Sequence, residues 1–244
     1  MNYVDRANAL PWIRGVKILK IDPNGLLAVE KPTGVMSHPN RKSDLGKALL
    51  QAHYDSKEQA YRVVDDEGEE TLVFLLNRLD SATSGVVLLS LNDEIVGEVK
   101  AAFERKRVEK IYKALVFGAP RGGSPSWKDR INVKSDGHKA RASGGGGLLA
   151  ETRLLDVKRF PGPPLTSLLT LQPITGRTHQ LRIQTSKRGM PIVGDRTYGN
   201  FQKNRAFGRS GKHQRLCLHC ESTKLEYRYK GKSFKFQEFS KCPF

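Results

Sequence analysis

Cysteine is scarce in this chain of 244 residues, which has Cys217, Cys220 and Cys242. So small and odd a set argues against a disulfide framework. Cys217 and Cys220 have the Cys-x-x-Cys spacing of a zinc ligand pair, but the sequence around them reads as a strand. Positions three apart on a strand point to opposite faces, which is unsuitable for chelation. We therefore expect neither a structural disulfide nor a bound metal.

Long apolar runs are also missing, and none approaches the ~20 residues needed to cross a bilayer. The first 15 residues have no basic start, apolar core or small-residue cleavage site of a secretory signal. No strongly amphipathic basic helix stands out that would lie on a membrane surface. We expect a cytoplasmic protein that does not associate with membranes.

Acidic residues are few relative to basic ones. The chain has 42 Lys+Arg against 25 Asp+Glu, a formal net charge of +17. Such an excess repels itself in a compact fold, so a polyanionic partner, foremost nucleic acid, is expected; a merely solvated basic surface is the alternative. Residues 100–113 and 202–215 are candidates for phosphate contacts, and the second stretch has no acid among its basic residues Lys203, Arg205, Arg209, Lys212 and Arg215.

Apolar and polar residues alternate in patterns that predict mostly strands. Two strands are expected in 16–34, two in 71–91 around a polar loop, one in 110–118, one from 165, and a hairpin in 225–239. Helices are expected in 43–54, in 92–107 with Asn92 or Asp93 as its cap, and in 180–186. The Gly-, Pro- and Ser-rich stretch 119–150 reads as an extended loop with short strands. The pattern predicts an α+β fold with a mixed, mostly antiparallel central sheet flanked by helices and loops.

The polar segment NRLDSATSG (77–85) places a carboxylate between two apolar strands. Rigid strands hold such a loop in place, as a catalytic group requires. Arg78 lies two residues before Asp80 in this segment. The alternative is a turn in which Asp80 only accepts hydrogen bonds from backbone amides.

Two further segments concentrate polar groups that bind or move charge. KIYKA (110–114) places Tyr112 between lysines, where it would stack on a base or transfer a proton, or simply pack its ring. GRTHQLR (176–182) places Arg177, His179 and Arg182 at a strand-to-helix junction. This density of cationic groups suits an anion site, or else a solvated basic surface.

Together, NRLDSATSG, KIYKA and PITGRTHQLRIQ resemble, in order and spacing, three blocks of the RluA-like pseudouridine synthases (RluA/RsuA type). AVEKPTGV (28–35), GMPIVGDRTYG (189–199) and RLCLHCESTKL (215–225) resemble further blocks of that family. The resemblance runs from about Val16 to Tyr229 and implies a pseudouridine synthase fold with an active-site cleft. It makes 16–244 the catalytic domain, preceded by a short extension, 1–15. Asn77 and Gln184 stand where histidine is common in the family, and Cys220 stands where alanine is common.

The resemblance also implies roles for individual residues. Asp80 corresponds to the catalytic aspartate, Tyr112 to the active-site tyrosine and Arg182 to the basic partner of Asp80, so we expect Arg182 to support that charge and not merely the fold. Arg78 corresponds to the loop arginine that enters the RNA when the target base leaves the stack. The residues expected to bind substrate are Arg78, Arg177 and His179.

The implied reaction converts uridine in RNA, either ribosomal or transfer RNA, to pseudouridine without net redox change. This agrees with the lack of a P-loop, a dinucleotide fingerprint or a metal cluster, and we expect no cofactor and a monomer. The main alternative is a non-catalytic RNA-binding or ribosome-assembly protein with the same fold. A glycoside or nucleoside hydrolase would usually need a second carboxylate, which none of the three segments has. A zinc deaminase would need its His-x-Glu and Pro-Cys-x-x-Cys signature.

Overall fold

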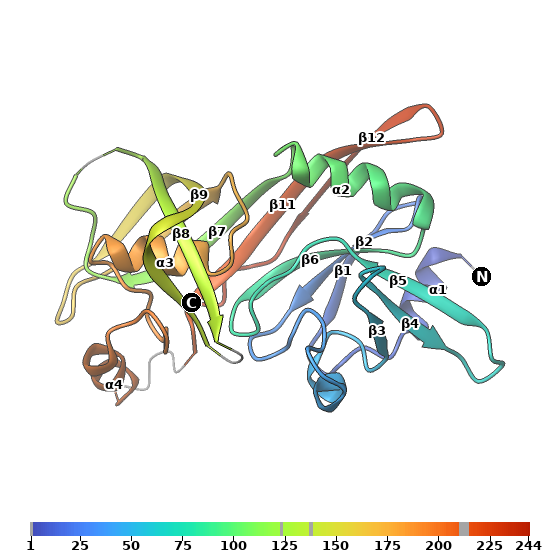
Figure 1. Cartoon of the computed structure of the whole chain (residues 1–244), viewed down its shortest axis with the longest axis horizontal. Helices are drawn as coiled ribbons and strands as arrows, with labels where there is room; N and C mark the ends of the chain where they lie inside the picture. The colour runs from blue at the N-terminus through green and yellow to red at the C-terminus, as the bar shows by residue number, and fades with distance from the viewer. Residues whose placement is uncertain (1, 123, 137–138, 210–214) are drawn as a thin grey trace. The chain divides into compact units, whose positions relative to one another are not determined.

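The computed structural model describes residues 2–122, 124–136, 139–209 and 215–244 (Figure 1). The chain forms two compact units. Unit 1 consists of Met1–Glu109 and Cys220–Lys241, and unit 2 consists of Lys110–His219 and Cys242–Phe244. Both are dominated by strands, as the sequence predicts, and no helix of the described residues is long and apolar enough to cross a membrane.

Unit 1 is built on a sheet whose strands follow the order β3-β4-β5-β6-β11, with β3 to β6 antiparallel to one another. Strand β2 pairs with both β1 and β6, and β12 pairs with β11. The two expected strands in 16–34 and the expected hairpin in 225–239 are confirmed. The strands are β1 (Lys17–Ile21), β2 (Leu26–Lys31), β3 (His53–Asp55), β4 (Ala60–Val64), β5 (Glu70–Leu75), β6 (Ser84–Ser90), β11 (Leu218–Tyr229) and β12 (Lys232–Phe239).

The core of unit 1 is centred on β6, all of whose residues are buried. A strand buried on both faces reads as a continuous apolar run, which is the pattern of SGVVLLS. Helix α2 (Val96–Glu104) follows the short 3-10 helix η2 (Asp93–Ile95), which is capped by the side chain of Asn92 as predicted. Figure 1 shows α2 running beside β11, and its apolar face buries Val99 and Ala102.

The helix expected in 43–54 is wrong. Only the 3-10 helix η1 (Lys42–Lys47) forms there, and the chain then continues in extended form. Ala48 bridges to Met36, and Leu50 bridges to Trp12, in the segment that follows helix α1 (Tyr3–Ala9). The apolar residues are therefore buried through pairing with distant segments and not through one face of a helix.

Unit 2 is a second antiparallel arrangement in which β7 pairs with β10, β10 with β9, and β9 with β8. Its strands are β7 (Glu109–Phe117), β8 (Ser126–Asp136), β9 (Lys139–Phe160) and β10 (Thr166–Pro173). The prediction of an extended loop with short strands in 119–150 is wrong in that β8 and the first half of β9 form a long hairpin there. Gly147 lies where the register of this hairpin shifts, and a Cβ atom there would overlap the backbone of Ile131.

Helix α3 (Gln180–Lys187) begins after the polar loop 174–179, as predicted, and contacts β8 and β9. Ile183 of α3 packs against Ile131 and Ala150 of these strands. Helix α4 (Phe201–Arg209) carries most of the basic stretch predicted to bind phosphate, whereas Lys212 lies outside the described residues.

Candidate active site

The loop that carries Asp80 is held in place by the buried side chain of Ser37. Its hydroxyl donates to the carbonyl of Leu79 and accepts from the amide of the same residue, both at 2.9 Å. At the start of the loop, Asn77 Oδ1 accepts a hydrogen bond of 2.7 Å from the amide of Leu88. The amide of Thr83 donates to the carbonyl of Asp80 at 2.9 Å and closes a turn. The backbone on either side of the carboxylate is therefore fixed.

A fully buried lysine fastens a second segment to this loop. Lys31 Nζ donates to the carbonyls of Pro32, Val35 and Ser81 at 3.0, 2.6 and 3.1 Å. A buried ammonium group requires such partners, because an isolated charge in the interior is very costly. The segment KPTG thus packs on the residue that directly follows Asp80.

Further contacts from the same segment reinforce this arrangement. The Thr33 hydroxyl donates to the carbonyl of Ala82, and the Gly34 amide donates to the carbonyl of Ser81. The sequence patterns had indicated no role for Lys31, although the block AVEKPTGV contains it.

Glycine is required where the loop enters β6. Gly85 has φ +115°, and a Cβ atom at this position would overlap the backbone of Cys220 in β11. The close approach of the two strands explains the glycine that ends NRLDSATSG. Cys217 and Cys220 are both buried and neither is in a disulfide. Burial raises the pKa of Cys217 to about 12. No group of three metal-ligating side chains occurs among the described residues.

Arg78 and Asp80 flank the buried Leu79, with Arg78 exposed and Asp80 half-buried. Arg78 Nη1 lies 3.1 Å from His38 Nε2. The His38 ring stacks on Tyr54 with 4.7 Å between ring centroids and 14° between planes. The guanidinium therefore rests against an aromatic pair beside the loop.

The protonation state of His38 decides whether its Nε2 can accept a hydrogen bond from Arg78. Burial lowers the pKa of His38, a hydrogen bond to the carbonyl of Pro39 opposes that shift, and the charge of Arg78 lowers the pKa further. A neutral ring with its proton on Nδ1 donates to Pro39 and leaves Nε2 free to accept from Arg78. Protonation at acidic pH would remove that acceptor and place two cations together.

We expect Arg78→Gln to raise the pKa of His38 toward its ordinary value of 6.5, because the neighbouring positive charge is removed. The shift is measured by NMR from the pH dependence of the His38 ring proton resonances. Arg62→Gln is the control, since Arg62 is paired with Asp55, Glu58 and Glu70. An unchanged or lower His38 pKa in Arg78→Gln would contradict the contact.

Arg182 and Asp195 form a buried, two-pronged ion pair in unit 2. Arg182 Nε donates to Asp195 Oδ2 at 2.8 Å, and Nη2 donates to Oδ1 at 2.9 Å. Asp195 Oδ1 also accepts from the amides of Thr197 and Tyr198. The Arg182 guanidinium lies over the Tyr198 ring, 5.2 Å from its centroid. Arg182 is therefore also part of the packing of its own unit.

The pKa of Asp195 reflects this environment. Burial alone would raise it, but the hydrogen bonds and charge of Arg182, with the amides of Tyr198 and Thr197, lower the pKa below 3.8. Because folding lowers this pKa, the ionised carboxylate stabilises the folded state above about pH 4, and the contribution is lost as the pH falls through the lowered value. The sequence patterns had not pointed to Asp195, although the block GMPIVGDRTYG contains it.

His179 and Arg177 lie at the start of α3. His179 has left-handed backbone angles, φ 55° and ψ 18°, and its Nδ1 lies 3.0 Å from the Tyr198 hydroxyl. Arg177 is exposed and donates through Nε to the carbonyl of Leu149 at 3.1 Å. Tyr198 thus contacts both His179 and Arg182, which brings two of the predicted residues together.

Two buried glutamines anchor α3 to β9. Gln180 Nε2 donates to the carbonyl of Glu151 and to the Thr152 hydroxyl, each at 2.9 Å. The Thr152 hydroxyl donates to Gln184 Oε1 at 2.6 Å, and Gln184 Nε2 donates to Asp129 at 2.8 Å. Gln184 therefore has a structural role at the position where the resembling family often has histidine.

Tyr112 lies in β7 and is 8% exposed. Its register partner in β10 is Leu171. The predicted residues accordingly fall into two groups. Asp80 and Arg78 belong to unit 1, and Tyr112, Arg177, His179 and Arg182 belong to unit 2.

Comparison with known proteins assigns the chain to a family. A model described as RNA pseudouridylate synthase matches residues 25–187. The chain belongs to the RNA pseudouridylate synthase family, as its sequence blocks had indicated. It is an RNA pseudouridine synthase, an isomerase.

Individual relatives agree with this assignment. The chain is 33% identical over 215 residues to tRNA pseudouridine synthase C of Pasteurella multocida, covering 84% of each chain. It is 30% identical over 238 residues to the dual-specificity RNA pseudouridine synthase RluA of Escherichia coli, covering 93% of each. The solved structure of human RNA pseudouridylate synthase domain containing 4 matches with a TM-score of 0.64 at 23% identity, over 99% of this chain and 92% of the other. That likeness confirms the pseudouridine synthase fold.

Proposed function

We propose that this enzyme converts specific uridines of transfer or ribosomal RNA to pseudouridine, with Asp80 as its catalytic carboxylate. The observation that carries the proposal is the position of Asp80 in NRLDSATSG, on a loop fixed by Ser37 and Lys31. A catalytic group must be held in a productive geometry by its supporting residues, and this loop meets that requirement.

The reaction breaks the N1–C1′ bond of uridine, turns the freed uracil and joins its C5 to C1′. The proton on C5 is then released and N1, freed from the ribose, takes up a proton, so the product is an isomer of the substrate and no electrons are gained or lost. Asp80 acts in ionised form, either by bonding covalently or by removing a proton from the ribose. Water must be excluded while the uracil is free.

We assign supporting roles to Tyr112 and Arg182 from their positions in KIYKA and GRTHQLRIQ. A buried tyrosine would stack on the uracil or donate to it, and an arginine near the carboxylate would favour its ionised form. Arg177 and His179 at the start of α3 would bind the RNA backbone. The proposal includes a cytoplasmic monomer that needs no metal or cofactor.

Transfer RNA and ribosomal RNA are both proposed as substrates because of the relatives' names. One relative is named a tRNA pseudouridine synthase and another a dual-specificity enzyme, and a relative from Vibrio vulnificus is named for the large ribosomal subunit. Mapping of pseudouridine in cells with and without the gene would identify the target, as the site whose modification disappears.

The proposal is tested by tritium release from RNA transcribed with 5-tritiated uridine. Formation of the C5–C1′ bond expels tritium from C5, so catalytic release into water is expected from the purified protein without added metal. The alternative, a non-catalytic RNA-binding or ribosome-assembly protein, predicts RNA binding without release. Absence of release from both RNA classes would favour that alternative.

Arg78→Ala is expected to slow modification of a structured stem-loop much more than that of a short unstructured oligonucleotide. Extrusion of a uridine leaves a gap in the stack, and a guanidinium leaving His38 would fill it. An unstructured strand has no stack to open. Both rates are measured by tritium release. Equal losses on the two substrates would instead assign Arg78 to the chemistry or the fold.

A further inference from the structure

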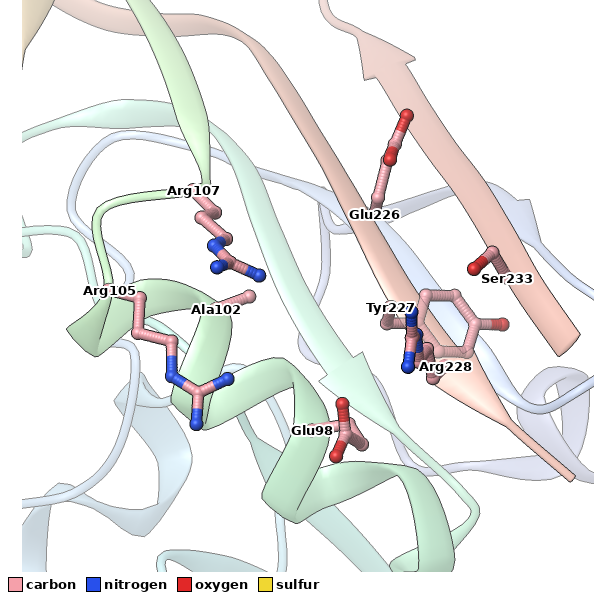
Figure 2. A pocket seen from close by; sticks show the side chains of 8 residues that line it. All are labelled: Glu98, Ala102, Arg105, Arg107, Glu226, Tyr227, Arg228 and Ser233. Carbon is pink, nitrogen blue, oxygen red and sulfur yellow. The ribbon is translucent and has the colours of Figure 1, made fainter. Parts of the chain in front are cut away.

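A hollow of about 670 Å³ lies in unit 1, between the end of α2 and the β11–β12 hairpin. Figure 2 shows its lining: Arg105 and Arg107 come from the end of α2 and the segment after it, and Arg228 comes from β11. Ala102 and Tyr227, which also line it, are buried. None of the residues that we assign to the reaction lines this hollow.

The three arginines of the hollow are exposed, and within the described part of the chain their guanidinium groups have no ion pair or hydrogen-bond partner. Arg62 of the same unit differs, because three carboxylates surround it. Guanidinium groups without intramolecular partners keep their planar donor forks available for phosphate oxygens.

The backbone that presents these arginines is well defined. Helix α2 ends with the amide of Arg107 donating to the carbonyl of Ala102 and that of Lys106 donating to Phe103. Lys106 has φ 56°, a left-handed conformation that favours glycine at helix ends. The chain therefore has an exposed cation where glycine would be less strained. Arg228 is fixed by its pairing with Ser233.

Carboxylates in the hollow do not cancel its charge. Glu226 lies 3.4 Å from Lys235, its cross-strand neighbour, and is compensated there. Glu98 also lines the hollow. Three arginines and Lys235 set against two glutamates leave an excess of two positive charges in this part of the surface.

We propose that this hollow binds the sugar-phosphate backbone of the RNA, as a second contact remote in sequence from the Asp80 loop. The inference rests on the RNA substrate of the proposed function. A volume within the ~300–1,000 Å³ of ligand sites would also suit a small molecule, but such sites are mostly apolar. Here most of the exposed lining residues are charged, so a phosphodiester strand fits the chemistry of the hollow better.

The test uses a long oligo(A), which contains no uridine and so reports binding without turnover. Arg105→Gln, Arg107→Gln and Arg228→Gln are combined in one variant. Each phosphate contact on a single strand contributes roughly 0.7 to the slope of log affinity against log salt. Loss of three contacts should therefore flatten the slope by about 2 and weaken binding at 0.1 M salt by about 100-fold.

A matched control removes the same number of charges elsewhere in unit 1. Lys17→Gln, Lys47→Gln and Lys57→Gln neutralise three exposed lysines that do not line the hollow. The control is expected to bind oligo(A) much more tightly than the arginine variant. Both variants should melt close to wild type, since the substituted side chains are exposed.

The outcomes separate the two proposals. If wild type releases tritium from uridine RNA but the arginine variant binds oligo(A) as the lysine control does, the hollow is not an RNA site. If wild type binds oligo(A) through these arginines but never releases tritium, the binding site stands and the proposed reaction fails. A lower affinity confined to the arginine variant, with tritium release from a short oligonucleotide retained, supports both.

Discussion

Asp80→Asn is expected to abolish pseudouridine formation while leaving RNA affinity within a few-fold of wild type. Asparagine keeps the size and shape of the side chain but removes the negative charge that either form of the reaction needs. The loop should keep its conformation, because Ser37 and Lys31 bind its backbone. Tritium release measures the activity, and filter binding measures the affinity.

Asn77→Asp is a useful comparison in the same loop. It keeps a carbonyl oxygen for the amide of Leu88 and adds a carboxylate three residues from Asp80. It should retain activity, whereas in combination with Asp80→Asn it should not restore any. Turnover near wild type in Asp80→Asn would assign Asp80 to the turn alone.

Arg182→Met is expected to lose both activity and stability. The substitution leaves the buried carboxylate of Asp195 without its two-pronged partner, and breaking a buried ion pair costs about 3–5 kcal/mol. Thermal or urea unfolding measures the loss. The family resemblance predicted that Arg182 supports the charge of Asp80 and not merely the fold, and the ion pair with Asp195 adds a structural role.

The two roles of Arg182 are separated by a double variant. Combining Arg182→Met with Asp195→Asn removes both charges, and the asparagine oxygen still accepts from the amides of Thr197 and Tyr198. We expect the double variant to regain part of the lost stability but no activity. Recovery of activity together with stability would show that Arg182 serves the fold and not the reaction.

Asp195→Asn alone gives a further check on the same pair. The pKa of Asp195 is lowered in the folded state, so its carboxylate stabilises wild type above about pH 4. As the pH falls below about 4, wild type should lose this contribution to its unfolding free energy, and the asparagine variant has no such contribution to lose. The difference in unfolding free energy between the two proteins should therefore shrink as the pH falls. A difference independent of pH would mean that the carboxylate contributes through its shape only.

Local patterns predicted those parts of the structure whose neighbours in sequence are also neighbours in space. The hairpin of β1 and β2, the capped start of η2 at Asn92 and the start of α3 after residue 179 are of this kind. The polar loop around Asp80 was found because apolar strands flank it on both sides. Its assignment to chemistry came from the family resemblance, since composition alone left a turn equally open.

Local patterns failed where a segment pairs with residues far away in sequence. Residues 43–54 have helical spacing, but Ala48 and Leu50 bridge to Met36 and Trp12. The residues on either side of the glycine run in β9 pair with β8. The supporting side chains Lys31 and Asp195 were missed for a related reason. Lys31 contacts Ser81, 50 positions away in sequence, and Asp195 contacts Arg182, 13 positions away. The periodicity of apolar residues carries no information about contacts over such separations.

The anchoring of the Asp80 loop has a consequence for how enzyme and substrate approach each other. Loops that carry functional groups are often among the first segments to open and exchange their amide hydrogens. Here the amide of Leu79 is bound by a buried hydroxyl, and that of Thr83 is held within the turn. A carboxylate on so rigid a loop cannot move far to reach a uridine. The RNA must therefore change conformation on binding, and how easily its helices open locally would decide which uridines are modified.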